Sequence, residues 1–112
     1  MQAQSLDRMF LALADPIRRS MVEELSDGPA SVKQLAVRAG MRLPSAVKHL
    51  KVLAESGIVS STKTGRIRTY AIEAPALQAI GAWVRTREAA WNKAFDRLAA
   101  AMQEISEEEI RQ

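Results

Sequence analysis

Basic residues gather in one stretch of this 112-residue chain, between Lys33 and Arg68. That stretch holds eight lysines and arginines against the single acid Glu55, a net charge of +7, whereas the rest of the chain carries eight basic and twelve acidic residues. Lysine and arginine side chains bind phosphates and carboxylates through charge-assisted hydrogen bonds. Solvated domains normally intersperse the two signs of charge, so this segregation favours a polyanionic partner over a merely solvated basic face.

The same inventory of side chains argues against an enzyme and against a metal site. The chain has no Cys, a single histidine at His49, and no Gly-rich phosphate loop, so neither an activated nucleophile nor a cofactor cradle is expected. A transition-metal site needs several nitrogen or sulfur donors, and a lone histidine is better explained by packing or by contact with a phosphate. We predict no catalytic residues, no cofactor and no metal.

Helix signals surround the basic stretch on its N-terminal side. Asp15 followed by Pro16 is a favoured helix opening, after a first helix near the N-terminus. Ser31 and Gln34 fit a capping box, which predicts a short third helix that Gly40 stops. A turn of three to four residues should then lead into the basic part of the chain.

A fourth helix is predicted over about residues 43–56, with Gly57 as its C-terminal stop. At 100° per residue its apolar residues fall on one face, while Lys48, Lys51 and Glu55 fall on the opposite face. This helix should pack by one side and present lysines on the other.

Residues 58–72 follow with β-branched and aromatic residues in alternation, and Gly65 supplies a turn residue that tolerates a positive φ. The pattern predicts a two-stranded hairpin with Lys63, Arg66 and Arg68 at and beside its tip. Charges there are typical of contact with a DNA backbone or minor groove, or of edge strands that resist aggregation.

A long helix is predicted over about residues 75–106, where apolar residues recur in heptads. A helix of about 30 residues spans roughly 45 Å, which is longer than a domain of this size covers. Part of its apolar stripe therefore needs a partner, unless the helix folds back on its own core. The acidic tail "EISEEEIRQ", residues 104–112, is expected to fray.

The order of these elements predicts a mainly α fold with a small β-hairpin. It is a winged helix-turn-helix in which the fourth helix fits a major groove about 12 Å wide and the hairpin reaches the flanking backbone. We expect a single domain over residues 1–112, with a DNA-binding core at about 5–72, its wing at 58–72, and a long C-terminal dimerisation helix.

Residues Leu11 to Ile72 resemble the winged helix-turn-helix repressors of the ArsR type. The resemblance is carried by "ALADPIRRSMVEEL", "LPSAVKHLKVLAESGIV" and "GRIRTYAI", in this order and spacing. It implies a bacterial or archaeal homodimer, joined mainly by its first and last helices, that represses its own gene until an inducer releases it from DNA. The residues expected at the dimer interface are Leu6, Met9, Phe10, Leu13, Val84, Trp91, Phe95, Leu98 and Met102.

The chain departs from the ArsR pattern at two DNA-facing positions. Arg42 stands where a small capping residue usually begins the fourth helix, and Val47 stands where a serine usually precedes the "KHL" triplet. The first change loses a cap but adds a cation, and the second offers an apolar contact to a thymine methyl. The residues expected to contact DNA are Lys33, Arg42, Ser45, Val47, Lys48, His49, Lys51, Lys63, Arg66 and Arg68.

The ligands of the family's metal sensors are missing from this sequence. The third helix lacks the Cys-x-Cys motif of the arsenic and cadmium sensors, and the last helix has carboxylates but no histidine. The chain is therefore similar to the subgroup without a metal site, and its inducer is unknown.

We expect a sequence-specific DNA-binding transcriptional regulator that binds an inverted-repeat operator as a homodimer, and most simply a repressor. The alternative is a winged-helix protein-interaction module that binds an acidic partner. No basic signal region or apolar run of membrane-spanning length precedes or follows these elements, so we expect a soluble, cytoplasmic, nucleoid-associated protein that contacts no membrane.

Overall fold

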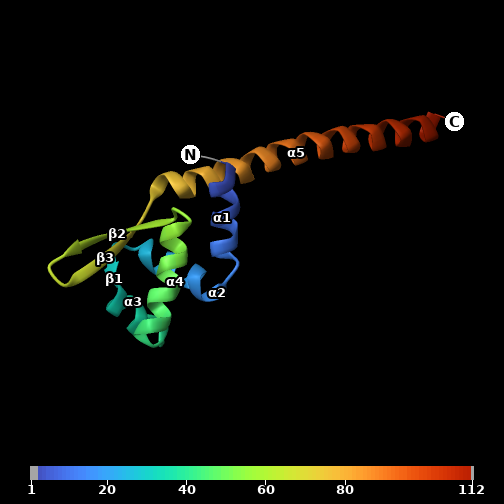
Figure 1. Cartoon of the computed structure of the whole chain (residues 1–112). Coiled ribbons are helices and arrows are strands. Elements are labelled where there is room, and N and C mark those ends of the chain that lie inside the picture. The colour runs from blue at the N-terminus through green and yellow to red at the C-terminus, as the bar shows by residue number, and fades with distance from the viewer. Residues whose placement is uncertain (1–2, 112) are drawn as a thin grey trace. The chain divides into compact units, whose positions relative to one another are not determined.

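The computed structural model describes the backbone of residues 3–111 and the side chains of residues 6–111. Within this range the chain forms five helices and three strands (Figure 1): α1 Ala3–Leu13, α2 Pro16–Leu25, β1 Ala30–Ser31, α3 Val32–Ala39, α4 Leu43–Glu55, β2 Val59–Thr64, β3 Ile67–Ile72 and α5 Ala74–Arg111. The predicted mainly α fold with a hairpin and a long last helix is confirmed. Two compact units divide the chain, one ending at Ile80 and the other beginning at Gly81.

The start of α2 is fixed by Asp15, whose side chain accepts hydrogen bonds from the backbone N–H groups of Ile17 at 2.8 Å and Arg18 at 3.1 Å. Pro16 occupies the first helical position, where its missing N–H costs nothing. The backbone hydrogen bond from Arg18 is the main cause that lowers the pKa of Asp15 below its usual value. The carboxylate thus stays ionised at the positive end of the helix.

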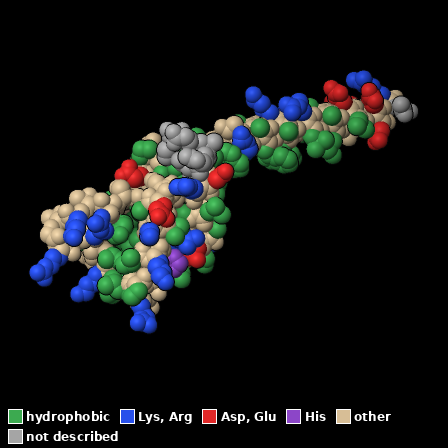
Figure 2. Space-filling model, in the orientation of Figure 1, with side chains coloured by type: hydrophobic (Ala, Val, Ile, Leu, Met, Phe, Trp, Pro, Cys, Tyr) green, Lys and Arg blue, Asp and Glu red, His purple; other side chains and the backbone are tan. Residues whose placement is uncertain are grey.

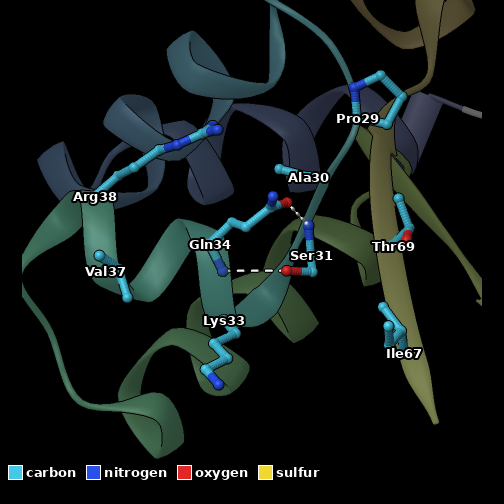
Figure 3. A pocket seen from close by; sticks show the side chains of 9 residues that line it. All are labelled: Pro29, Ala30, Ser31, Lys33, Gln34, Val37, Arg38, Ile67 and Thr69. Carbon is cyan, nitrogen blue, oxygen red and sulfur yellow. Dashed lines mark hydrogen bonds between the residues drawn. The ribbon is translucent and has the colours of Figure 1, made fainter.

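The start of α3 has the predicted capping box. Ser31 Oγ accepts from the backbone N–H of Gln34 at 3.1 Å, and the Gln34 side chain accepts from the backbone N–H of Ser31 at 2.9 Å (Figure 3). At the other end, Gly40 has a φ of +64° and ends the helix in the left-handed conformation. The turn from Gly40 to Arg42 then leads directly into α4, which completes the helix-turn-helix.

The sheet has three strands in the order β1-β3-β2, all antiparallel, rather than the two predicted. The hairpin pairs Val59 with Ile72 at its base and Thr64 with Ile67 at its tip, where Gly65 has a φ of +64°. The additional strand, β1, has two residues and pairs with Thr69 and Tyr70 of β3. A two-residue strand is too short to show alternation, so the sequence pattern did not reveal it.

The core of the first unit lies between the helices and the base of the sheet. Its buried apolar residues are Met9, Ala12, Met21, Leu25, Ala30, Leu35, Ala36, Ala46, Leu50, Leu53, Ile58, Val59, Tyr70 and Ala76. Ala76 belongs to the first turn of α5, and Ile80 one turn later also packs against this core. The beginning of α5 is therefore an integral part of the first unit.

One expected dimer-interface residue is placed differently by the structure. Met9 is only 1% exposed and lies inside the core, so the prediction that it contacts a partner is wrong. Leu6 and Leu13 are half-buried, and Phe10 on the same helix remains partly exposed. An apolar stripe on a short helix looks the same whether it packs on its own core or on another subunit, which explains the error.

The second unit consists of the rest of α5, from Gly81 onward. The helix extends to Arg111 instead of ending near residue 106, so the acidic tail is helical rather than frayed. No Gly or Pro follows Gly81, and glutamate is a good helix former, which accounts for the longer helix. Within residues 3–111, no helix is both long and apolar enough to cross a membrane.

The start of α4 lacks a side-chain cap, as its sequence predicted. Arg42 occupies the N-cap position with extended backbone angles, φ −72° and ψ 148°, but makes no capping hydrogen bond. We predict that Arg42→Ser raises the free energy of unfolding by about 1 kcal/mol, because a serine hydroxyl at this position accepts a hydrogen bond from the backbone N–H of Ser45, the third residue of the helix. Urea denaturation should show this gain for Arg42→Ser and not for the control Arg42→Ala; equal midpoints in the two variants would contradict it.

Candidate nucleic-acid interface

Helix α4 has one buried face and one exposed face, as predicted. Ala46, Leu50 and Leu53 are completely covered by the core, whereas Lys48 and Lys51 are exposed. The positions at the start of the helix that we expect to face DNA are exposed as well: Arg42, Ser45 and Val47. The structure thus brings the expected α4 residues to one accessible surface, with His49 at its half-buried edge.

Most cations of the basic stretch have no partner within the described part of the chain. Arg38 forms an ion pair with Glu24 at 3.5 Å, and Arg68 donates to Ser61 Oγ at 2.8 Å. Among residues 6–111, no hydrogen bond or ion pair occupies the remaining six side chains: Lys33, Arg42, Lys48, Lys51, Lys63 and Arg66. These six side chains are therefore free to donate charge-assisted hydrogen bonds, for example to phosphate oxygens.

The wing concentrates positive charge at a cost to its own stability. Lys63 of β2 lies directly opposite Arg68 of β3, and Arg66 lies in the turn between the strands. Like charges directly opposite each other in an antiparallel pair are destabilising. Figure 2 shows Lys and Arg side chains over the hairpin and the lower helices of the first unit, with no acidic side chain among them at the left and lower edges of this view.

A hollow of about 490 Å³ lies between α3 and β3, next to the wing (Figure 3). Its walls include two strongly exposed apolar side chains, Val37 at 73% and Ile67 at 61%. Lys33 also lines it, with Ser31 and Thr69 as hydroxyl-bearing neighbours. Lys33 therefore lies beside the wing strand β3. It belongs to α3 and not to α4, where most of the other expected DNA contacts lie.

His49 is held by a residue that the sequence analysis did not single out. Its Nδ1 lies 3.5 Å from Nη1 of Arg18, which comes from the first turn of α2. The contact joins residues 31 positions apart, so no local pattern reveals it. One signal was present: a cation in the first turn of a helix is unfavourable for the helix dipole, which indicates that Arg18 has a partner elsewhere.

Among residues 6–111, no group of three or more His, Cys, Asp or Glu side chains is arranged to hold a metal ion. The unpaired cations of this surface support ionic and hydrogen-bonded recognition of an anion.

A helix pair with a cationic second helix, followed by a cationic β-wing, defines the winged helix-turn-helix class of DNA-binding folds. Residues 13–62 match the family model described as a helix-turn-helix domain. The chain is 38% identical over 77 residues to the HTH-type transcriptional regulator Rv2034 of Mycobacterium tuberculosis, covering 69% of this chain and 72% of that protein.

Two solved structures are also similar. A crystal structure of an ArsR family transcriptional regulator matches with a TM-score of 0.74 and 41% identity, over 82% of this chain and 95% of that one. The solution structure of a homodimeric winged helix-turn-helix DNA-binding domain from Mycobacterium bovis, a possible ArsR-family regulator, matches with a TM-score of 0.64 and 26% identity, over 76% and 79% of the two chains. The chain belongs to the ArsR family of transcriptional regulators.

The two exposed lysines of α4 give a direct test of the interface. We predict that Lys48→Ala and Lys51→Ala each weaken binding to duplex DNA and lower the magnitude of the slope of log K against log salt by about one, because each lysine neutralises one phosphate. Fluorescence anisotropy at several salt concentrations measures both quantities. Lys93→Ala, which removes an exposed lysine from α5, is the control, and an unchanged slope in both α4 variants would remove them from the interface.

Proposed function

We propose that this protein is a homodimeric transcriptional repressor that binds an inverted-repeat operator through α4 and the wing. The observation that carries the proposal is the set of free cations on one accessible surface of the first unit. Helix α4 enters the major groove, where Lys48 and Lys51 contact phosphates, and the wing residues Lys63 and Arg66 contact the flanking backbone or minor groove. Family membership supports this assignment of roles.

The second unit supports dimerisation through its apolar stripe. Phe95 and Met102 alternate with Trp91, Leu98 and Ile105 in a heptad pattern, and all five side chains are more than half exposed. The rings of Trp91 and Phe95 also contact each other, with centroids 6.3 Å apart. Figure 2 shows apolar side chains in a row along this part of α5. A stripe of this size is larger than most monomers expose, and a second copy of the helix would cover it.

The charges of this helix favour an antiparallel arrangement of the two copies. The segment from Arg85 to Arg97 has four basic and two acidic residues, whereas Glu104 to Arg111 has four acidic residues and one basic residue. Antiparallel pairing places the basic segment of one helix beside the acidic segment of the other, and parallel pairing places like charges together.

A symmetric dimer accounts for the expected form of the operator. Two copies of α4 related by a twofold axis read two half-sites of opposite orientation, about one helical turn of DNA apart. Dimerisation therefore raises the affinity for DNA, because both half-sites are bound together.

The second candidate is a protein-interaction module in which the same cations bind an acidic protein. It rests on the same observation but predicts a different response to DNA. A module of that kind binds operator and random duplexes equally weakly, whereas a repressor distinguishes them.

The function is tested by titrating the purified protein against the DNA immediately upstream of its own gene, with a scrambled duplex as the control. We expect tight binding that is selective for the natural sequence and falls linearly in log K with log salt. Equal weak binding to both duplexes would favour the protein-interaction module, or an operator elsewhere in the genome. Loss of reporter expression in cells that carry the protein distinguishes a repressor from an activator.

Dimerisation has its own test at Trp91, which is 67% exposed in the apolar stripe. We predict that Trp91→Glu produces monomers, because it places a carboxylate in an apolar interface in both copies. Sedimentation equilibrium gives the mass directly. Gln103→Glu, which adds the same single negative charge at an exposed position of α5 outside the stripe, should remain dimeric; an intact dimer for Trp91→Glu would refute the proposed interface.

A further inference from the structure

Arg18 connects three helices through one side chain. Its Nε donates to the carbonyl of Ala12 at 2.6 Å and its Nη2 donates to the carbonyl of Leu11 at 3.3 Å, both near the end of α1. Its Nη1 lies 4.0 Å from the Asp15 carboxylate at the start of α2 and 3.5 Å from Nδ1 of His49 in α4. The side chain is 17% exposed, so most of its surface is covered by protein.

This environment explains why the position holds an arginine. The last carbonyls of α1 have no partners inside their own helix and carry its partial negative charge. A guanidinium offers five N–H donors in a fixed planar fork, which serves two carbonyls and a ring nitrogen at once. The compact ammonium of a lysine lacks this fork, so lysine at Arg18 would not hold all of these acceptors together.

The contact decides which nitrogen of His49 carries hydrogen. Arginine donates and never accepts hydrogen bonds, so Nδ1 of His49 must be the acceptor and the hydrogen of the neutral ring must lie on Nε2. Protonation of Nδ1 would place an N–H group against the guanidinium. The contact with Arg18 thereby favours this orientation and the Nε2–H tautomer of the imidazole.

The other ring nitrogen is open to solvent. Among the described residues, Nε2 of His49 has no hydrogen-bond partner, and no buried side-chain nitrogen or oxygen there lacks one. His49 lies one helical turn after Ser45 and next to Lys48, both exposed on the surface of α4 that faces DNA in the proposed function. A fixed N–H donor therefore stands at the edge of that surface.

We propose that Arg18 is a positioning residue for DNA binding, which holds His49 so that its Nε2–H donates to a phosphate of the duplex. This inference rests on the proposed function, because it requires α4 to contact DNA. It adds a neutral donor to the cationic contacts. It also makes the orientation of a DNA contact on α4 depend on the end of α1, so a displacement of α1 would change the affinity for DNA.

Two substitutions of His49 separate its two nitrogens. His49→Asn keeps an amide near the position of Nδ1, within reach of Arg18, but loses the Nε2 donor. We expect it to reduce DNA affinity by about tenfold, the effect of losing a hydrogen bond to a charged group, with little change in thermal stability. The slope of log K against log salt should stay unchanged, because a neutral donor releases no counterion, in contrast to Lys48→Ala. His49→Gln, whose amide reaches the Nε2 position, should recover part of the affinity.

Substitution of Arg18 tests the link between the two residues. We expect Arg18→Met to lower DNA affinity, and the double variant Arg18→Met/His49→Asn to bind about as well as His49→Asn alone, because the two residues act through one contact. Arg19→Met is the matched control: Arg19 donates to the Leu13 carbonyl at 2.7 Å but makes no contact with His49, so its loss should leave affinity nearly unchanged. Fully additive losses for Arg18 and His49 would overturn the proposal.

A spectroscopic readout keeps the proposal testable if Arg18→Met folds poorly. His49 is the only histidine of the chain, so its ring ¹⁵N signals are unambiguous. We expect the neutral wild-type ring to be solely the Nε2–H tautomer, and Arg18→Lys to show a mixture of both tautomers. A substantial Nδ1–H population in the wild type would overturn the proposal even if the protein binds DNA. Failure of the wild type to bind any duplex, with the tautomer as expected, would instead overturn the proposed function and, with it, the role of the contact.

Discussion

The structure of the first unit depends on one constraint: α4 has one face buried in the core and the opposite face in contact with solvent. One side of this helix supplies Ala46, Leu50 and Leu53 to the centre of the core, where no water reaches them. The other side carries Lys48 and Lys51. Burial of the apolar side fixes the rotation of the helix, because even a small rotation would bring charge into a close-packed interior. The direction in which the lysines point therefore follows from core packing and not from contacts that the lysines make themselves.

Several positions around α4 break the rules of local stability. The helix begins at Arg42 without a capping hydrogen bond, and Lys63 stands opposite Arg68 in the wing. Each feature costs some stability in the free protein, and each adds exposed positive charge to the first unit. Natural sequences usually depart from local consistency where function requires it. Both departures add positive charge, which supports binding of a polyanion and favours a functional cause for each of them.

The fold could be predicted largely because its decisive signals are local. The capping box at Ser31 and the left-handed stop at Gly40 each depend on residues within four positions, and both were visible in the sequence. Features set by distant contacts were not visible. β1 exists because β3 offers it a pairing edge, and Met9 is buried because other helices cover it. The candidate site shows the same division, since exposure of Lys48 follows from helical periodicity and the contact of His49 does not.

The contact between Arg18 and His49 joins residues far apart in the chain, yet the sequence contains one indication of it. Arg18 and Arg19 lie in the first turn of α2, where the helix dipole disfavours cations, and both donate to carbonyls at the end of α1. The negative end of one helix thus compensates for the positive end of the next, with Asp15 between them as the cap. These hydrogen bonds connect the end of α1 to the start of α2 at the corner between the two helices. Since Arg18 also contacts His49, a hydrogen-bond contact as well as packing connects α4 to the end of α1. A ligand or subunit that engages α1 therefore has a physical route to the exposed surface of α4.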